Sequence, residues 1–160
     1  MSILTFCAVS GDDLPRAPLE ALAAARKLSD ELGGTDVQTL LAGAEVKRHG
    51  SALIERGADQ VFVVDDPKLE LLEEDLLLST LEEAAEQLSP AIIILPHDER
   101  SGGNVAPRLA YRLRTGIVTD CTGFEVEDGT LRWLRPVYGG KAMARVKATG
   151  SFQLATVRSL

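Results

Sequence analysis

The sequence is poor in the residue types that usually carry covalent cross-links or catalysis. Its 160 residues include two cysteines, two histidines, one tryptophan and only 4% aromatic residues. Two isolated thiols, Cys7 and Cys121, make neither a disulfide framework nor a metal site with regular spacing. We therefore expect both thiols to be reduced and buried, as free cysteines commonly are.

Long hydrophobic runs and an excess of positive charge are also missing. The longest apolar runs, such as residues 91–95, have the length of a strand, whereas a membrane span needs roughly 20 residues. The N-terminal apolar stretch lacks the basic lead-in and the cleavage site of a secretory signal. The net charge of −7 argues against nonspecific binding to nucleic acid or to an anionic membrane. We expect a cytoplasmic protein with no membrane insertion and no nucleic-acid partner.

The first two thirds of the chain alternate between short apolar runs and amphipathic stretches. With 45% hydrophobic residues the chain can bury one substantial core, so we expect a single domain over residues 1–160. Apolar runs predict strands at residues 3–9, 37–42, 60–64 and 91–95, and helical spacing predicts helices near 19–32, 47–56, 75–88 and 103–113. Strands separated by helices imply an α/β fold with a doubly wound, mainly parallel sheet.

The pattern changes near residue 121. Segments 121–127 and 130–137 flank Asp128-Gly129, a two-residue hairpin signal because both residues tolerate positive φ. A turn at residues 138–140 leads into a strand at 142–147, and a last strand covers 152–157. We expect a β-rich, largely antiparallel C-terminal extension, whose strand order a single sequence does not reveal.

One loop is placed where α/β proteins bind ligands, beyond the carboxyl end of the apolar strand at residues 91–95. Its candidate ligand residues are His97, Ser101, Gly102, Gly103 and Asn104. Helix N-terminal amides beside two glycines could hold an anion, whereas Ser101 could instead cap the helix. Because Asp98 and Glu99 in the same loop disfavour phosphate, we interpret it as a degenerate nucleotide site.

The remaining polar motifs do not assemble into a catalytic or metal site. His49 lies beside Lys47 and Arg48 and is expected on a solvated helix surface. Asp120 next to Cys121 would raise the pKa of the thiol and make it less reactive, so we interpret the pair as a structural motif at a strand start. Residues 10–13 are expected to form an acidic surface turn. Residues 139–141 lack the flanking residues of a phosphate-binding loop.

A second group of residues favours an interface. Arg135, Tyr138 and Lys141 surround the turn at residues 138–140, and arginine and tyrosine supply much of the energy of protein interfaces. We interpret this hairpin as facing a partner. The alternative is an ordinary surface turn with Tyr138 lying on its own sheet.

Four segments of the sequence carry a family resemblance. They are Asn104-Val105-Ala106-Pro107-Arg108-Leu109, Thr119-Asp120-Cys121-Thr122, Arg135-Pro136-Val137-Tyr138-Gly139-Gly140-Lys141-Ala142 and Ala155-Thr156-Val157-Arg158. In order and spacing they resemble the first domain of the electron-transfer flavoprotein alpha subunit. The resemblance implies an adenine-nucleotide alpha-hydrolase-like fold. In that family an FAD-binding domain follows the last segment, so we expect FAD in the complete protein and none bound to these 160 residues alone.

The resemblance also implies a role and partners. The family protein is a heterodimer of alpha and beta subunits that carries electrons on FAD from flavin dehydrogenases to an acceptor. This domain would be a non-catalytic scaffold that supports the beta subunit and the FAD domain, and it could form a homodimer when isolated. The beta subunit of the family binds AMP through the loop that corresponds to residues 97–104, whereas the alpha subunit generally does not. A stand-alone nucleotide-binding module of universal-stress type remains the alternative, followed by a small hydrolase.

Overall fold

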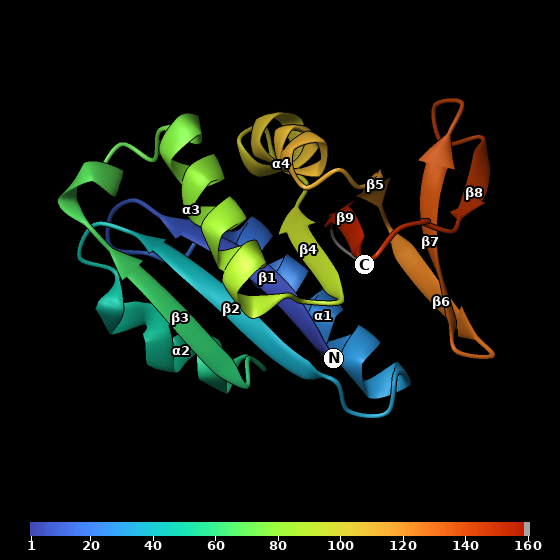
Figure 1. The fold of residues 1–160 in the computed structure, drawn as a ribbon, viewed down its shortest axis with the longest axis horizontal. Coiled ribbons are helices and arrows are strands. Elements are labelled where there is room, and N and C mark those ends of the chain that lie inside the picture. Colours follow the sequence, from blue (N-terminus) through green and yellow to red (C-terminus); the bar gives the residue numbers. More distant parts are fainter. Residues whose placement is uncertain (159–160) are drawn as a thin grey trace.

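The chain begins as an alternation of strands and helices and ends as a run of strands (Figure 1). A computed structural model describes residues 1–158. The helices are α1 (Arg16–Glu31), α2 (Gly50–Glu55), α3 (Glu74–Leu88) and α4 (Ala106–Arg112). The strands are β1 (Ser2–Val9), β2 (Asp36–Gly43), β3 (Gln60–Asp65), β4 (Ile92–Pro96), β5 (Ile117–Cys121), β6 (Gly123–Glu127), β7 (Thr130–Val137), β8 (Ala142–Val146) and β9 (Gln153–Val157).

The main sheet has six parallel strands in the order β3-β2-β1-β4-β9-β5. The chain therefore moves outward from β1 to β3 and then crosses back to β4 on the other side of β1. A second sheet of three antiparallel strands, β6-β7-β8, lies beside the β5 end of the first (Figure 1). The predicted doubly wound α/β fold with a β-rich extension is confirmed.

Each face of the main sheet has its own apolar core. Alternate residues of β1 point to opposite faces, so Ile3 and Cys7 pack in one core and Leu4 and Phe6 in the other. The first core contains buried residues of α1 and α2, and the second contains those of α3 and α4. Strand β4 is covered on both faces, and all five of its residues are apolar and buried.

The last strand differs from the expected antiparallel tail. β9 is inserted between β4 and β5 and runs parallel to both. Its residues 154–157 are at most 1% exposed, which an apolar strand achieves only when both its edges and both its faces are covered. Strand β5 was not predicted separately, because its apolar run Ile117-Val118 is too short to show the hydrophobic periodicity of a strand.

The hairpin predicted at Asp128-Gly129 is confirmed. Both turn residues have positive φ, 49° and 71°, and they join β6 to β7. The small sheet is fixed to the body by Trp133, which is fully buried in the α1-side core and donates from Nε1 to Gln153 Oε1 at 3.0 Å. Phe124 meets Trp133 edge to face, and the Lys27 ammonium lies 5.6 Å from the Phe124 ring centre.

Two predicted helices start later than expected. Residues Lys47–His49 form a tight 3-10 turn before α2, and residues Ser101–Val105 form a π-helical turn before α4. Pro107 occupies the first turn of α4. The first N–H groups of a helix have no intrahelical acceptor, so a proline at this position costs no hydrogen bond. The π-helical turn therefore carries the chain from the loop after β4 into the regular helix.

Candidate functional site

The loop after β4 is attached to the end of β9. The backbone N–H of His97 donates to Val157 O at 2.8 Å, and its Nδ1 lies 2.9 Å from Thr156 Oγ1. Thr156 is fully buried, whereas the His97 side chain remains about one third exposed. The imidazole is thus held by one ring nitrogen, and its Nε2 faces Asp120 Oδ1 at 3.7 Å.

The amides of this loop are already occupied by Asp98. Ser101 N donates to the Asp98 carboxylate at 2.6 Å, and the N–H groups of Gly102 and Gly103 both donate to Asp98 O at 2.9 Å. The capping role considered for Ser101 is therefore wrong. The Asp98 carboxylate, and not the Ser101 hydroxyl, accepts a hydrogen bond from the amide at the start of the turn, and Ser101 is itself buried. A phosphate at this position would have to displace the Asp98 carboxylate from Ser101 N and the Asp98 carbonyl from the amides of Gly102 and Gly103.

The two glycines of the loop have different structural roles. A Cβ on Gly102 would lie 2.8 Å from His97 Cα and 3.0 Å from His97 Nδ1, so no other residue fits without a shift. A Cβ on Gly103 would have only Asp98 O within reach, at 3.8 Å. Gly102 is thus explained by packing against His97 and requires no ligand to account for it.

Asn104 is directed to a different neighbour. Its side-chain oxygen accepts from Arg108 at 3.0 Å, and Arg108 also pairs with Asp75 of α3. Ser101 and Gly102 are buried, Gly103 is exposed, and His97 faces β9. The amides of Ser101, Gly102 and Gly103 thus bond Asp98, whereas the side chains of His97 and Asn104 bond Thr156 and Arg108. We keep the degenerate nucleotide site as an interpretation.

Asp120 lies at the end of β5, which corrects its expected place at a strand start. Its φ is 59°, and the pairing of β5 with β9 slips between Val118 and Cys121 at this point. The Asp120 N–H donates to Thr156 Oγ1 at 3.0 Å, and its carboxylate meets Arg158 Nε at 2.8 Å. The strained backbone therefore turns the carboxylate toward His97 and Arg158.

Three of the family-like segments meet in a hollow beside this pair. It encloses about 460 Å³ and is lined by Asp120, Arg158 and the β7–β8 turn, that is Arg135, Pro136, Val137, Tyr138, Gly139 and Gly140. Arg135 lies on the same side of β7 as the buried residues Leu131 and Trp133. The guanidinium thus comes from an inward position of the strand.

Within residues 1–158, Arg135 combines a buried Nε that lacks a hydrogen bond with the lack of an ion pair. Arg26, whose Nε also lacks a hydrogen bond, pairs with Asp30 and Asp59. Burial raises the pKa of the Cys121 thiol to about 12, and the charge of Arg135 works against that rise. Arg135 also lines the same hollow as Asp120, so its positive charge lies close to the end of β5.

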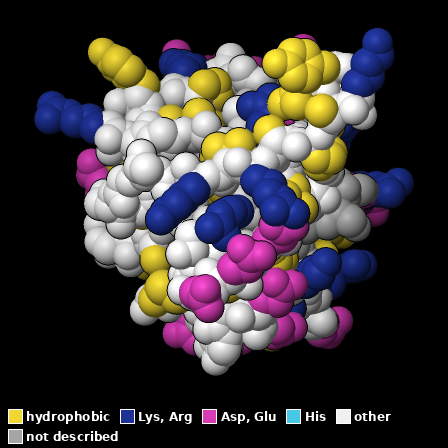
Figure 2. All heavy atoms as spheres, turned by 90° about the vertical axis from the view of Figure 1, so that its right-hand side faces the viewer, with side chains coloured by type: hydrophobic (Ala, Val, Ile, Leu, Met, Phe, Trp, Pro, Cys, Tyr) yellow, Lys and Arg dark blue, Asp and Glu magenta, His cyan; other side chains and the backbone are white. Residues whose placement is uncertain are grey.

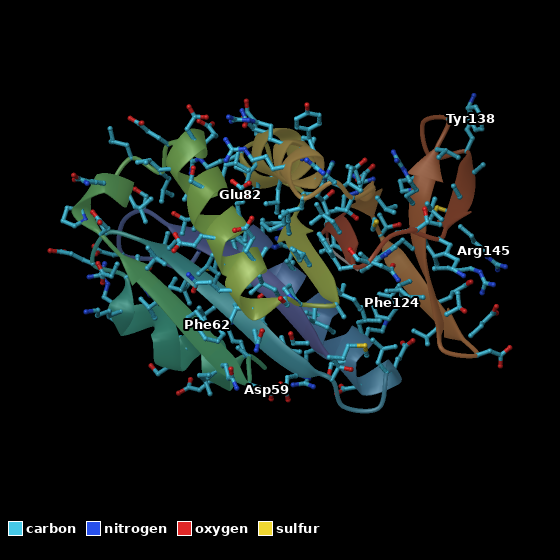
Figure 3. All side chains as sticks on the ribbon, viewed as in Figure 1. Asp59, Phe62, Glu82, Phe124, Tyr138 and Arg145 are labelled. Atoms are coloured by element: carbon cyan, nitrogen blue, oxygen red, sulfur yellow. The ribbon has the colours of Figure 1, made fainter. Side chains whose placement is uncertain are left out.

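The turn beyond Arg135 is fully accessible. Figure 3 shows Tyr138 at the tip of the β7–β8 turn, pointing away from the body. Tyr138 is 83% exposed, Met143 on β8 is 53% exposed, and Lys141 is exposed as well. Seen from this side, Lys and Arg side chains gather across the middle of the face, between hydrophobic and acidic groups (Figure 2). Within the small sheet, Arg132 of β7 pairs with Glu127, and Arg145 of β8 pairs with Glu125.

Two predictions about isolated residues have different outcomes. His49 was expected in solvent, but it is only 9% exposed and contacts Arg48, whose guanidinium bonds Asp12 Oδ1 at 2.8 Å and Gly11 O at 3.1 Å. The prediction for His49 is therefore wrong, because the 3-10 turn rotates it inward. Cys7 and Cys121 are free and buried, as expected, and burial raises the pKa of each thiol to about 12.

The described residues contain neither a cluster of metal ligands nor a membrane-spanning helix. No group of three or more His, Cys, Asp or Glu side chains in residues 1–158 is arranged to hold a metal ion. No helix in the same part of the chain combines the length and apolar character of a membrane span.

Sequence comparison matches residues 3–159 to the electron transfer flavoprotein domain. This chain belongs to the electron transfer flavoprotein family. It is 37% identical over 147 residues to the electron transfer flavoprotein subunit alpha of Thermoanaerobacterium thermosaccharolyticum, and 35% identical over 146 residues to that of Bacillus subtilis. It is also 30% identical over 168 aligned positions to the acryloyl-CoA reductase electron transfer subunit beta of Anaerotignum propionicum.

These matches cover most of this chain and less than half of each relative. They include 91% of this chain and 44% of the two alpha subunits, and 90% and 45% for the third relative. The chain thus corresponds to part of an electron transfer flavoprotein alpha subunit, and the resemblance drawn from the four segments is confirmed.

Proposed function

We propose that residues 1–160 form one domain, the non-catalytic scaffold of an electron transfer flavoprotein alpha subunit. The observation that carries the proposal is the convergence of three family-like segments at one end of the main sheet, around Asp120, Arg135 and Arg158. In this proposal Asp120, Arg135 and Arg158 position a surface and a turn. The amides of the nucleotide-type loop already donate to Asp98. Its similarity to two alpha subunits over 91% of its length supports the same role.

The complete protein would act with a beta subunit and an FAD domain. In this proposal FAD carries electrons from flavin dehydrogenases to an acceptor, and the FAD is bound outside these 160 residues. Exposed aromatic and thioether groups such as Tyr138 and Met143 are typical of protein interfaces. We assign the β7–β8 turn, with Arg135, Tyr138 and Lys141, to contact with one of these two partners. Two free buried thiols agree with a cytoplasmic location.

A binding experiment with the beta subunit of the same organism tests this role. Light scattering after gel filtration should detect a one-to-one complex, because the base domain is proposed to supply a partner surface. Tyr138→Ala should weaken the complex, and Tyr111→Ala is the matched control, since Tyr111 is 85% exposed on α4. Equal effects of the two changes would remove the β7–β8 turn from the interface, and no complex with the unaltered chain would contradict the scaffold role.

The flavin content of the purified chain gives a second test. The isolated 160 residues should be colourless after gel filtration, because the proposal places FAD elsewhere. A stoichiometric flavin absorbance would contradict it. Calorimetry with AMP separates the nucleotide-module alternative: micromolar affinity that is lost on Gly103→Asp would favour that alternative over the scaffold.

A further inference from the structure

The hollow beside Asp120 holds more positive than negative charge. Arg158 is balanced by Asp120, with Nε to Oδ1 at 2.8 Å and Nη2 to Oδ2 at 3.4 Å. Arg135 has no carboxylate within ion-pair distance among residues 1–158. Lys141, which adds a third positive side chain next to the turn, is exposed. Lys141 is not part of the lining, so the lining itself carries one uncompensated positive charge, that of Arg135.

Burial makes this charge significant. A cation on a solvated surface needs no partner, but the Nε of Arg135 is removed from solvent and bonds to nothing in the described residues. Leaving a buried N–H of a charged group without an acceptor is costly, so such groups normally meet an anion or an oxygen. The side of β7 that carries Arg135 continues a row of fully apolar core positions, where an arginine is otherwise unexpected.

The position of the hollow is suited to a small ligand. It lies beyond the carboxyl ends of β5 and β9, and ligands of open parallel sheets bind at that edge. A volume of about 460 Å³ falls within the range of small-molecule sites. The turn at Tyr138-Gly139-Gly140 forms one wall of the hollow. A Cβ added to Gly139 or Gly140 would have no atom within 4 Å, so the space around this turn is not filled by other groups.

We propose that Arg135, supported by Arg158 and the Tyr138–Gly140 turn, binds a phosphate group, either as inorganic phosphate or on a small phosphorylated molecule. A guanidinium offers a planar fork of donors that matches the oxygens of phosphate. Asp120 lies within ion-pair distance of Arg158, which reduces the repulsion between its carboxylate and an anion, although the buried Asp120 Oδ1 accepts no hydrogen bond within residues 1–158. This site does not use the amides of the loop at residues 97–104, although Asp120 in its lining lies 3.7 Å from His97 Nε2. It shares Arg135 and the β7–β8 turn with the proposed partner surface, but binding of phosphate can be measured without the partner.

The test is binding of inorganic phosphate to the purified chain, followed by nuclear magnetic resonance of backbone amides and by thermal shift. Phosphate should move the signals of residues 135–140 and 158 and raise the melting temperature above that in sodium chloride of equal ionic strength. Arg135→Gln should weaken phosphate binding about tenfold or more, the loss expected when a charge-assisted bond is removed. Arg132→Gln is the matched control, because Arg132 lies on the outer side of the same strand and pairs with Glu127.

A second variant and two further ligands complete the test. Arg135→Lys keeps the positive charge but loses the planar donors of the guanidinium, so it should bind phosphate with intermediate affinity. This variant tests the proposal even if Arg135→Gln does not fold. AMP binding with the affinity of phosphate would identify the phosphate group alone as the ligand, and tighter AMP binding would identify a nucleotide. The proposal is overturned if phosphate acts no differently from chloride, if Arg132→Gln weakens binding as much as Arg135→Gln, or if acetate binds as well as phosphate. The last result would indicate that Arg135 receives a carboxylate side chain of a protein partner.

Discussion

Thr156 Oγ1 lies 2.9 Å from His97 Nδ1 and accepts a hydrogen bond from Asp120 N at 3.0 Å. A single fully buried hydroxyl on β9 thereby connects the loop after β4 with the irregular end of β5. These three strands are adjacent in the sheet but distant in sequence. The hydroxyl fixes the position of the Asp120 backbone, and hence of the carboxylate that pairs with Arg158.

Replacing that hydroxyl should destabilise the protein. Thr156→Val keeps the shape but leaves Asp120 N–H without its acceptor, which we expect to cost about 1–3 kcal/mol in the free energy of unfolding. Urea unfolding followed by circular dichroism measures the change. Thr156→Ser should recover most of the stability, because the hydroxyl is restored. Equal stability of the valine variant and the unaltered chain would show that the bond contributes nothing.

The two glycines of the loop should respond differently to substitution. Gly102→Ala places a methyl group 2.8 Å from His97 Cα, so we expect overpacking to cost about 1–3 kcal/mol. Gly103→Ala should be neutral or slightly stabilising, since its Cβ has room and alanine favours helix. Thermal unfolding of both variants makes the comparison. A larger loss for Gly103→Ala would contradict the packing explanation.

Acid unfolding should depend on Asp65. Backbone N–H groups of Lys47 and Glu45 bond to its carboxylate and lower its pKa below the ordinary value. Because the folded pKa is the lower one, the carboxylate stabilises the fold above the unfolded pKa of about 3.9, and that contribution is lost as the pH falls through the folded pKa. Asp65→Asn should therefore be less stable at pH 7, with the difference shrinking below about pH 4.

Urea unfolding at several pH values between neutral and acid checks this dependence. Asp13→Asn serves as the control, because Asp13 is exposed and its carboxylate makes no hydrogen bond or ion pair within residues 1–158. A difference between Asp65→Asn and the unaltered chain that stays constant from pH 7 to pH 3 would exclude the proposed titration.

The two thiols should be inert in the folded protein. Burial raises the pKa of Cys7 and of Cys121 to about 12, so almost no thiolate exists at pH 8. A thiol reagent should therefore modify both cysteines only after unfolding, and the modification rate should follow the unfolding equilibrium. Rapid labelling of native protein would show that one thiol is accessible. Cys7→Ser and Cys121→Ser would then identify it.

The isolated chain should self-associate. Tyr138 and Met143 leave apolar area exposed on the small sheet, and a twofold homodimer is the simplest way to cover it. Light scattering across a concentration series should show dimer formation, which Tyr138→Ala and Arg135→Ala should reduce while Tyr111→Ala leaves it unchanged. A strict monomer at high concentration would refute self-association, and a dimer insensitive to Tyr138 would place the contact elsewhere.

Local sequence was sufficient for the elements whose signals are local. The apolar run at β4, the spacing of Leu22 and Leu28 on α1, and Asp128-Gly129 each predict the structure found there. The four family-like segments were sufficient to identify the family. Periodicity and turn chemistry act over a few residues, so they can be read before the chain is folded.

Other features depend on contacts between distant segments, and only the folded chain reveals them. The sequence does not show that β9 lies between β4 and β5, because strand pairing has no local signature. It likewise does not show that the amides of the loop after β4 bond Asp98, that His49 turns inward, or that Arg135 lines the same hollow as Asp120 and Arg158. The sequence by itself determined the α/β class, the hairpin and the family. The tertiary structure decided which charged groups share a hollow and which are already paired, because those energies depend on burial and distance.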